Sequence, residues 1–134
     1  MAGEQRGEAE ASGRRAVLLV DDERQCLLAG ERLLGLLGYD GLLAGSGAAA
    51  VDLFQEHRER IDLVILDLIM PFMDGAETFR RLKALDPEVR IMIASGYIRE
   101  DMKEELDAAG AAGFLSKPFD FEKFEGEVQR ALSR

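Results

Sequence analysis

The sequence predicts an α/β fold with one doubly wound, five-stranded parallel sheet. Short runs of consecutive apolar residues, typical of strands buried on both faces, alternate with longer segments in which apolar residues recur every three or four positions. Turn-forming residues separate the two kinds of segment, and no internal repeat is present. This alternation is typical of βα units whose helices cover both faces of one sheet.

Five apolar runs are expected to form the strands. They lie at residues 16–20, 42–44, 63–66, 91–94 and 113–115, and the second is the shortest and weakest. Longer segments follow each run, so each strand is expected to be succeeded by a helix. Gly38 marks the end of the first helix, Gly47 precedes the second and Pro87 follows the third.

The fourth and fifth helices each carry a single apolar stripe. The stripe residues are Ile98, Met102, Leu106 and Ala109 in the fourth helix and Phe121, Phe124, Val128 and Leu132 in the fifth. One such stripe per helix predicts packing against one face of the sheet.

The chain of 134 residues is expected to hold one domain. Residues 1–14 contain almost no large apolar side chain, so their burial cannot offset the entropy lost on ordering. We therefore predict a disordered leader at 1–14 and a folded domain at 15–134.

Charge and composition argue against several function classes. The formal net charge of −9 repels a nucleic-acid backbone and anionic lipid, so neither is expected as a direct partner. No apolar run approaches the roughly 20 residues of a membrane span, and the stretch after Arg14-Arg15 is too short for an export signal. The lone Cys26 has no partner at metal-ligand spacing and fits a reducing compartment, so a cytoplasmic protein is expected.

Five reactive side chains lie at or just after predicted strand ends. They are Asp21, Asp22, Asp67, Ser95 and Lys117. In an open α/β sheet the carboxyl ends of the strands form one edge, where ligands bind at the point at which the strand order reverses. These residues are therefore expected to converge.

Three carboxylates brought together repel, so the cluster should shift a pKa or bind a cation. An all-oxygen ligand set suits Mg²⁺, with Mn²⁺ as a substitute, and no His or Cys accompanies the cluster to indicate zinc. Lys117 and Ser95 add the positive charge and the donor that a phosphoryl group uses. Asp67, which ends the central strand, is the candidate nucleophile for an aspartyl phosphate.

Four motifs carry these residues. They are Asp21-Asp22-Glu23, Asp67 followed by Met70-Pro71-Phe72-Met73-Asp74-Gly75, Ser95-Gly96, and Lys117-Pro118-Phe119. In this order and spacing they resemble a response-regulator receiver domain of the CheY-like kind, from two-component phosphorelays. The resemblance spans about residues 16–132. It implies a flavodoxin-like sheet of order 2-1-3-4-5 and a protein that is not a turnover enzyme.

The resemblance also implies a chemistry. Mg²⁺ would be held by Asp22, by Asp21 through water, by Asp67 and by the main-chain carbonyl of Ile69. A partner histidine kinase would phosphorylate Asp67 from its phosphohistidine. A cis peptide bond at Lys117-Pro118 would direct the lysine ammonium.

A conformational switch is implied as well. Ser95 would turn toward the phosphoryl oxygen, and Phe114 would swing inward into the space vacated. An output protein or domain would dock on the face of the fourth helix, fifth strand and fifth helix, with the chain a monomer or weak homodimer. The sequence leaves open the kinase, the output target, and whether the chain acts alone or belongs to a hybrid kinase or longer regulator.

Four further residues, three near the site and one at the end of the second helix, complete these expectations. Phe72 stands where many relatives have glycine, and either shields the phosphate, touches a partner or is a tolerated loop residue. Ile69 and Tyr97 occupy positions that in the family govern access of hydrolytic water, and their bulk predicts slow loss of the phosphoryl group. His57 is expected to be an exposed polar residue away from the acidic edge.

Other functions and simpler roles fit these residues less well. Gly45-Ser46-Gly47-Ala48-Ala49-Ala50, with Asp67 as the acid that follows, fits the pattern of a nucleotide-binding α/β domain. That interpretation leaves Asp21, Asp22, Ser95 and Lys117 without a role. A phosphatase with an aspartyl-phosphate intermediate would need an acid two residues after Asp67, where Ile69 stands. A receiver that acts by binding alone would not need the five site residues. For Asp22 a simpler role is also possible, because an aspartate before a helical segment is typical of a helix N-cap.

Overall fold

The computed structural model describes residues 14–70 and 74–133, which form one five-stranded parallel sheet with helices on both faces. The spatial order β2-β1-β3-β4-β5 confirms the predicted fold class. The strands are β1 (Ala16–Val20), β2 (Asp40–Ala44), β3 (Ile61–Asp67), β4 (Ile91–Ser95) and β5 (Gly113–Ser116). The order reverses between β1 and β3, so their carboxyl ends mark the expected ligand edge.

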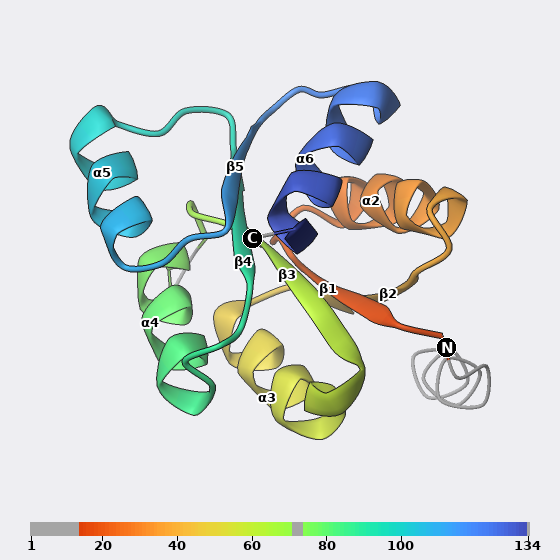
Figure 1. The fold of residues 1–134 in the computed structure, drawn as a ribbon, viewed down its shortest axis with the longest axis horizontal. Coiled ribbons are helices and arrows are strands. Elements are labelled where there is room, and N and C mark those ends of the chain that lie inside the picture. The colour runs from red at the N-terminus through yellow and green to blue at the C-terminus, as the bar shows by residue number, and fades with distance from the viewer. Residues whose placement is uncertain (1–13, 71–73, 134) are drawn as a thin grey trace.

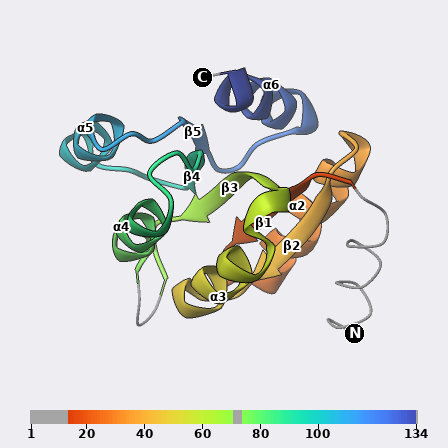
Figure 2. The same ribbon diagram turned by 60° about the horizontal axis from the view of Figure 1, so that its bottom comes forward.

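The helices form two layers over this sheet. They are α2 (Arg24–Leu36), α3 (Gly47–His57), α4 (Gly75–Leu85), α5 (Glu100–Ala108) and α6 (Phe121–Ser133), with a short 3-10 turn η1 (Arg58–Arg60) after α3. Figure 1 shows α2 and α6 together on one side of the sheet and α3 and α4 on the other, and Figure 2 shows the same layers from below. No helix in the described ranges has the length and apolar character that crossing a membrane demands.

Each central strand supplies both layers of the core. Leu18 and Val20 of β1 pack with residues of α3, α4 and α5, whereas Val17 and Leu19 pack with residues of α2 and α6. Successive side chains of a strand point to opposite faces, which is why β1 and β4 are apolar along nearly their whole length and fully buried. This two-sided burial positions the strand ends rigidly.

The structure extends or corrects several sequence-based expectations. Strand β2 begins at Asp40 because Asp40 and Gly41 pair with β1, and main-chain pairing does not require an apolar side chain. His57 was expected to be exposed, and that expectation was wrong. It is only 4% exposed because it lies one turn after Phe54, on the same buried side of α3.

Two further expectations concern the chain outside these elements. The Lys117-Pro118 peptide bond is cis, as the resemblance implied. The predicted leader lies outside the described residues except for Arg14, and so does Phe72.

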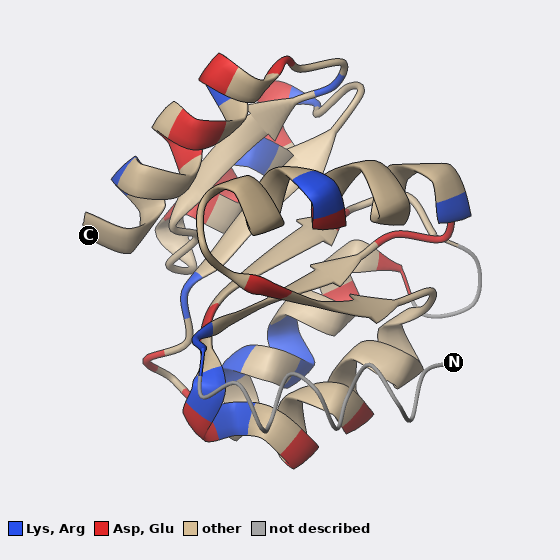
Figure 3. Cartoon of the chain, turned by 90° about the vertical axis from the view of Figure 1, so that its right-hand side faces the viewer, with Lys and Arg blue, Asp and Glu red and all other residues tan. Residues whose placement is uncertain are grey.

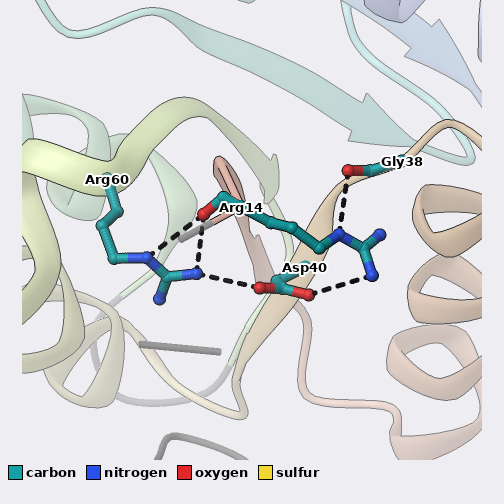
Figure 4. Close-up of polar contacts among 4 residues, drawn as sticks. All are labelled: Arg14, Gly38, Asp40 and Arg60. Atoms are coloured by element: carbon teal, nitrogen blue, oxygen red, sulfur yellow. Dashed lines mark hydrogen bonds and ion pairs between the residues drawn. The ribbon is translucent and has the colours of Figure 1, made fainter. Parts of the chain in front are cut away.

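A polar network ties the start of β1 to β2 and η1, at the end of the sheet opposite the ligand edge (Figure 4). The Arg60 guanidinium donates to the Arg14 carbonyl and, at 2.9 Å, to the Asp40 carboxylate. Arg14 in turn donates to the Gly38 carbonyl and pairs with Asp40 at 3.5 Å. Gly38 has a φ of 89° at the end of α2, a conformation that glycine adopts without strain. The network therefore joins three segments that are distant in the sequence.

Replacing Arg60 with Met is expected to lower the free energy of unfolding by about 2 kcal/mol. The Arg60 and Asp40 side chains are only 18% and 17% exposed, so the variant leaves a largely buried carboxylate and a carbonyl short of a donor. Urea unfolding measures the change. Arg32→Met, at an exposed position of α2, is the matched control and should shift stability by less than about 0.5 kcal/mol. Equal stability of both variants would show that the network contributes nothing.

Candidate functional site

The carboxyl ends of four strands bring the predicted residues together. Asp67 is the last residue of β3, and Asp21 and Lys117 directly follow β1 and β5. Although Lys117 and Asp21 are 96 positions apart, the ammonium lies 2.5 Å from the Asp21 carboxylate. The same ammonium lies 3.9 Å from an oxygen of Asp67. The geometry thus brings these three side chains into one site, as the strand-end pattern predicted.

Three carboxylates meet at this edge. Asp21, Asp22 and Asp67 each offer an oxygen, and these oxygens lie within 4.8 Å of one another. Asp21 and Asp67 are buried, whereas Asp22 is exposed. In Figure 3 the loop from β1 into α2 is acidic, while the segment that enters β1 at the other end of the sheet is basic. An oxygen cluster of this size fits a hard divalent cation that keeps several waters.

The helix-cap role considered for Asp22 is not the one observed. The N-cap of α2 is Glu23, whose side chain makes no cap hydrogen bond. The Glu23 N–H donates instead to Asp21 at 2.9 Å, which orients the Asp21 carboxylate. Asp22 therefore lies beside the other two carboxylates without serving the helix.

Burial and charge shift the ionisation of this site. Burial raises the pKa of Asp67, and the neighbouring Asp21 raises it further, while Lys117 opposes the change. Burial also lowers the pKa of Lys117, but the hydrogen bond to Asp21 and the charge of Asp67 outweigh it and leave the pKa above its ordinary value. Lys117 is therefore an ammonium at neutral pH. Asp67 is therefore harder to ionise than a free aspartate, and another positive charge beside it would lower its pKa.

Ser95 is the last residue of β4, immediately after Ala94, which pairs with Asp67 in the sheet. Adjacent strands lie about 4.8 Å apart, which places Ser95 beside Asp67. Its hydroxyl donates to the main-chain carbonyl of Tyr97 at 3.1 Å, so it does not point its hydrogen at the carboxylate. Phe114 is half-buried on β5, with the Lys103 ammonium 5.4 Å from its ring centroid.

Gly75, at the start of α4, is a positioning residue whose role its place in the motif after Asp67 did not reveal. Its N–H donates to the Leu68 carbonyl at 2.9 Å. A Cβ at this position would lie within 3.0 Å of the Leu68 Cα and of the Asp67 carbonyl oxygen, both backbone atoms. Glycine therefore lets α4 begin directly against the backbone that carries Asp67. The one signal in the sequence was the Asp-Gly pair at a helix start soon after Asp67.

Two neighbours of the site complete its outline. Ile69 and Tyr97 are 71% and 73% exposed, and the Ile69 N–H donates to Asp67 at 3.4 Å.

The expectation that Cys26 has no partner at metal-ligand spacing, and that no Cys accompanies the cluster, was wrong. The Cys26 sulfur lies within 4.8 Å of oxygens of Asp21 and Glu23, because the first turn of α2 brings Cys26 back toward the end of β1.

Comparison with known proteins gives one consistent answer. Residues 17–129 match the response regulator receiver domain family. The chain is 34% identical to sporulation initiation phosphotransferase F of Bacillus subtilis, over 87% of this chain and 92% of that protein. It is also 34% identical to sensor kinase CckA of Brucella abortus, over 93% of this chain but only 13% of that protein.

A solved structure shows the same similarity. The CheX-CheY-BeF3-Mg²⁺ complex from Borrelia burgdorferi matches with a TM-score of 0.82 and 28% identity, over 86% of this chain and 87% of that one. Similar chains thus occur both as nearly the whole of a small protein and as a short part of a long kinase.

Proposed function

The chain belongs to the response regulator receiver domain family of two-component systems, and on that premise we propose that a partner histidine kinase phosphorylates Asp67. One observation carries the proposal: Asp67 ends a central strand beside two further aspartates and the Lys117 ammonium. An Asp67 oxygen attacks phosphorus as the bond from phosphorus to the histidine nitrogen breaks, and the nitrogen retains the electron pair.

The donor set fits Mg²⁺, or Mn²⁺ in its place. Asp21, Asp22, Asp67 and the main-chain carbonyl of Ile69 would hold the ion, which supplies positive charge to the phosphoryl oxygens when bound. Lys117 stabilises the same developing charge from the β5 side. Its shortest contact is with Asp21, so we propose that it moves from Asp21 toward the phosphoryl group during transfer.

Incubation with acetyl phosphate, followed by intact-mass measurement, tests this assignment. One phosphoryl group is expected in the presence of Mg²⁺ and very little in EDTA. Equal incorporation in EDTA would contradict the metal requirement, and no incorporation with Mg²⁺ would contradict the phosphoacceptor role.

We further propose that Ser95 and Phe114 transmit the change. Ser95 exchanges the Tyr97 carbonyl for a phosphoryl oxygen, and Phe114 turns inward from its place beside Lys103. The output partner then docks on the face of α5, β5 and α6, with the chain a monomer or weak homodimer in the cytoplasm. Contact with nucleic acid or membrane is not part of this proposal, and bulky Ile69 and Tyr97 slow phosphoryl loss.

Ser95→Ala is expected to separate phosphorylation from switching. The variant keeps the carboxylates and Lys117, so Asp67 still gains a phosphoryl group. It lacks the hydroxyl that follows the phosphate, so the ring signals of Phe114 in NMR spectra should shift much less on phosphorylation than in wild type. A shift equal to that of wild type would exclude Ser95 as the coupling residue.

The phosphatase alternative makes a different prediction. Ile69 has no proton to donate to a leaving group, so we expect no multiple-turnover hydrolysis of a phosphate ester. Turnover of such an ester would support the alternative.

A further inference from the structure

A largely apolar groove of about 580 Å³ lies between α2 and α6, on the face of the sheet that these two helices share. Its floor includes Leu19 and Ile65, its α2 wall includes Leu27 and Leu33, and its opposite wall includes Phe119 and Phe124. The volume falls within the roughly 300–1,000 Å³ typical of small-molecule sites. The groove is therefore large enough for an aromatic or branched aliphatic group.

Short side chains create this space. Cys26 and Ala29 face it from α2, and Ala94 and Gly96 face it from β4 and the loop after it. None of them reaches far across the gap between the two helices. Helix α2 packs on β1 and β2, whereas α6 packs on β3, β4 and β5, so the space between the two helices lies over the middle of the sheet.

One end of the groove is formed by Asp21, Asp67 and Lys117. The Lys117 ammonium pairs with Asp21 and Asp67, and the Asp22 carboxylate lies beside these two, so this end carries a net negative charge. Asp67 is only 8% exposed, yet Lys117 lies beyond hydrogen-bond distance from it and the Ile69 N–H makes a long contact of 3.4 Å. An additional cation donor would complete the hydrogen bonding of this carboxylate.

We propose that the groove binds a small amphipathic cation, with its apolar body between α2 and α6 and its ammonium group on Asp67 and Asp21. Charge complementarity selects the ammonium, because a carboxylate at this end would meet three like charges and only the Lys117 ammonium, which Asp21 already engages. Such a ligand occupies the position proposed for Mg²⁺ and therefore competes with the metal and with phosphorylation. Only this competition rests on the proposed function; the binding itself does not.

The test compares three probes of one shape in EDTA, by NMR titration of the amide signals of the full chain. The probes are 2-phenylethylammonium, 2-phenylethanol and 3-phenylpropanoate. We expect the ammonium to bind at least about tenfold more tightly than the alcohol, with shifts in α2, α6 and around Asp67, and the carboxylate not to bind. Equal affinity for all three probes, or shifts confined to other surfaces, would overturn the proposal.

Ala29→Leu fills the groove without touching the carboxylates. It is expected to weaken ammonium binding at least about tenfold while Mg²⁺ affinity stays unchanged. Leu36→Met, at a position of α2 that is 72% exposed and away from the groove, is the matched control and should bind like wild type. Unchanged binding to a folded Ala29→Leu variant would place the ammonium elsewhere and refute the site.

A Mg²⁺ titration separates the two proposals. In wild type the apparent dissociation constant of the ammonium should rise with Mg²⁺ saturation. If Mg²⁺ does not bind but the ammonium does, the proposed function fails and the groove site stands. If Mg²⁺ binds and the ammonium does not, the groove site alone fails.

Discussion

Asp67→Asn is expected to abolish phosphoryl transfer from acetyl phosphate in the presence of Mg²⁺. The amide cannot act as the nucleophile, and the other carboxylates are placed differently: Asp21 is engaged by Lys117 and the Glu23 N–H, and Asp22 lies exposed outside the strand. Intact-mass measurement should show one added phosphoryl group on wild type and none on the variant. This is the largest effect that a single substitution in the chain should produce.

The control for this experiment is Asp52→Asn, on the exposed side of α3, which should be phosphorylated like wild type. Folding of Asp67→Asn is checked by thermal melting in EDTA. Because burial raises the pKa of Asp67, its ionised form opposes folding above that pKa, and the neutral amide should raise the melting temperature. A phosphoryl group on folded Asp67→Asn would show that another residue is the acceptor.

Gly75→Ala is expected to cause the second largest loss. The added methyl group would lie within 3.0 Å of the backbone of Asp67 and Leu68, and backbone atoms cannot turn aside as a side chain can. Either the first turn of α4 or the segment that carries Asp67 must move. We expect destabilisation of about 2 to 3 kcal/mol in urea unfolding. We also expect phosphorylation to slow about a hundredfold, as displacement of a reacting group by about 1 Å can cause.

Gly35→Ala is the matched control, since nothing lies within 4 Å of a Cβ there. At that helical position alanine should stabilise the protein by about 0.5 to 1 kcal/mol and leave phosphorylation unchanged. If Gly75→Ala matched the control in both measurements, the contact between α4 and the Asp67 backbone would have no role in the site.

The strands were predictable because their side chains are buried on both faces, which requires unbroken apolar runs such as 16–20 and 91–94. The start of β2 was not, since Asp40 and Gly41 join the sheet through main-chain pairing with β1. The burial of His57 was also not predictable, because it depends on a tertiary contact that the local sequence does not mark. The sequence shows a polar residue near a helix end, while the fold places it on the side of α3 that Phe54 shares.

The sequence by itself determined the fold class and the convergence of Asp21, Asp67, Ser95 and Lys117, because strand ends are marked locally and parallel strands end at a common edge. Only the tertiary structure decided that Lys117 pairs more closely with Asp21 than with Asp67, that Gly75 has no room for a Cβ, and that a groove remains between α2 and α6. These features depend on distances of a few ångströms between segments far apart in the chain. Such distances follow from how the layers pack, and no local pattern of residues specifies them.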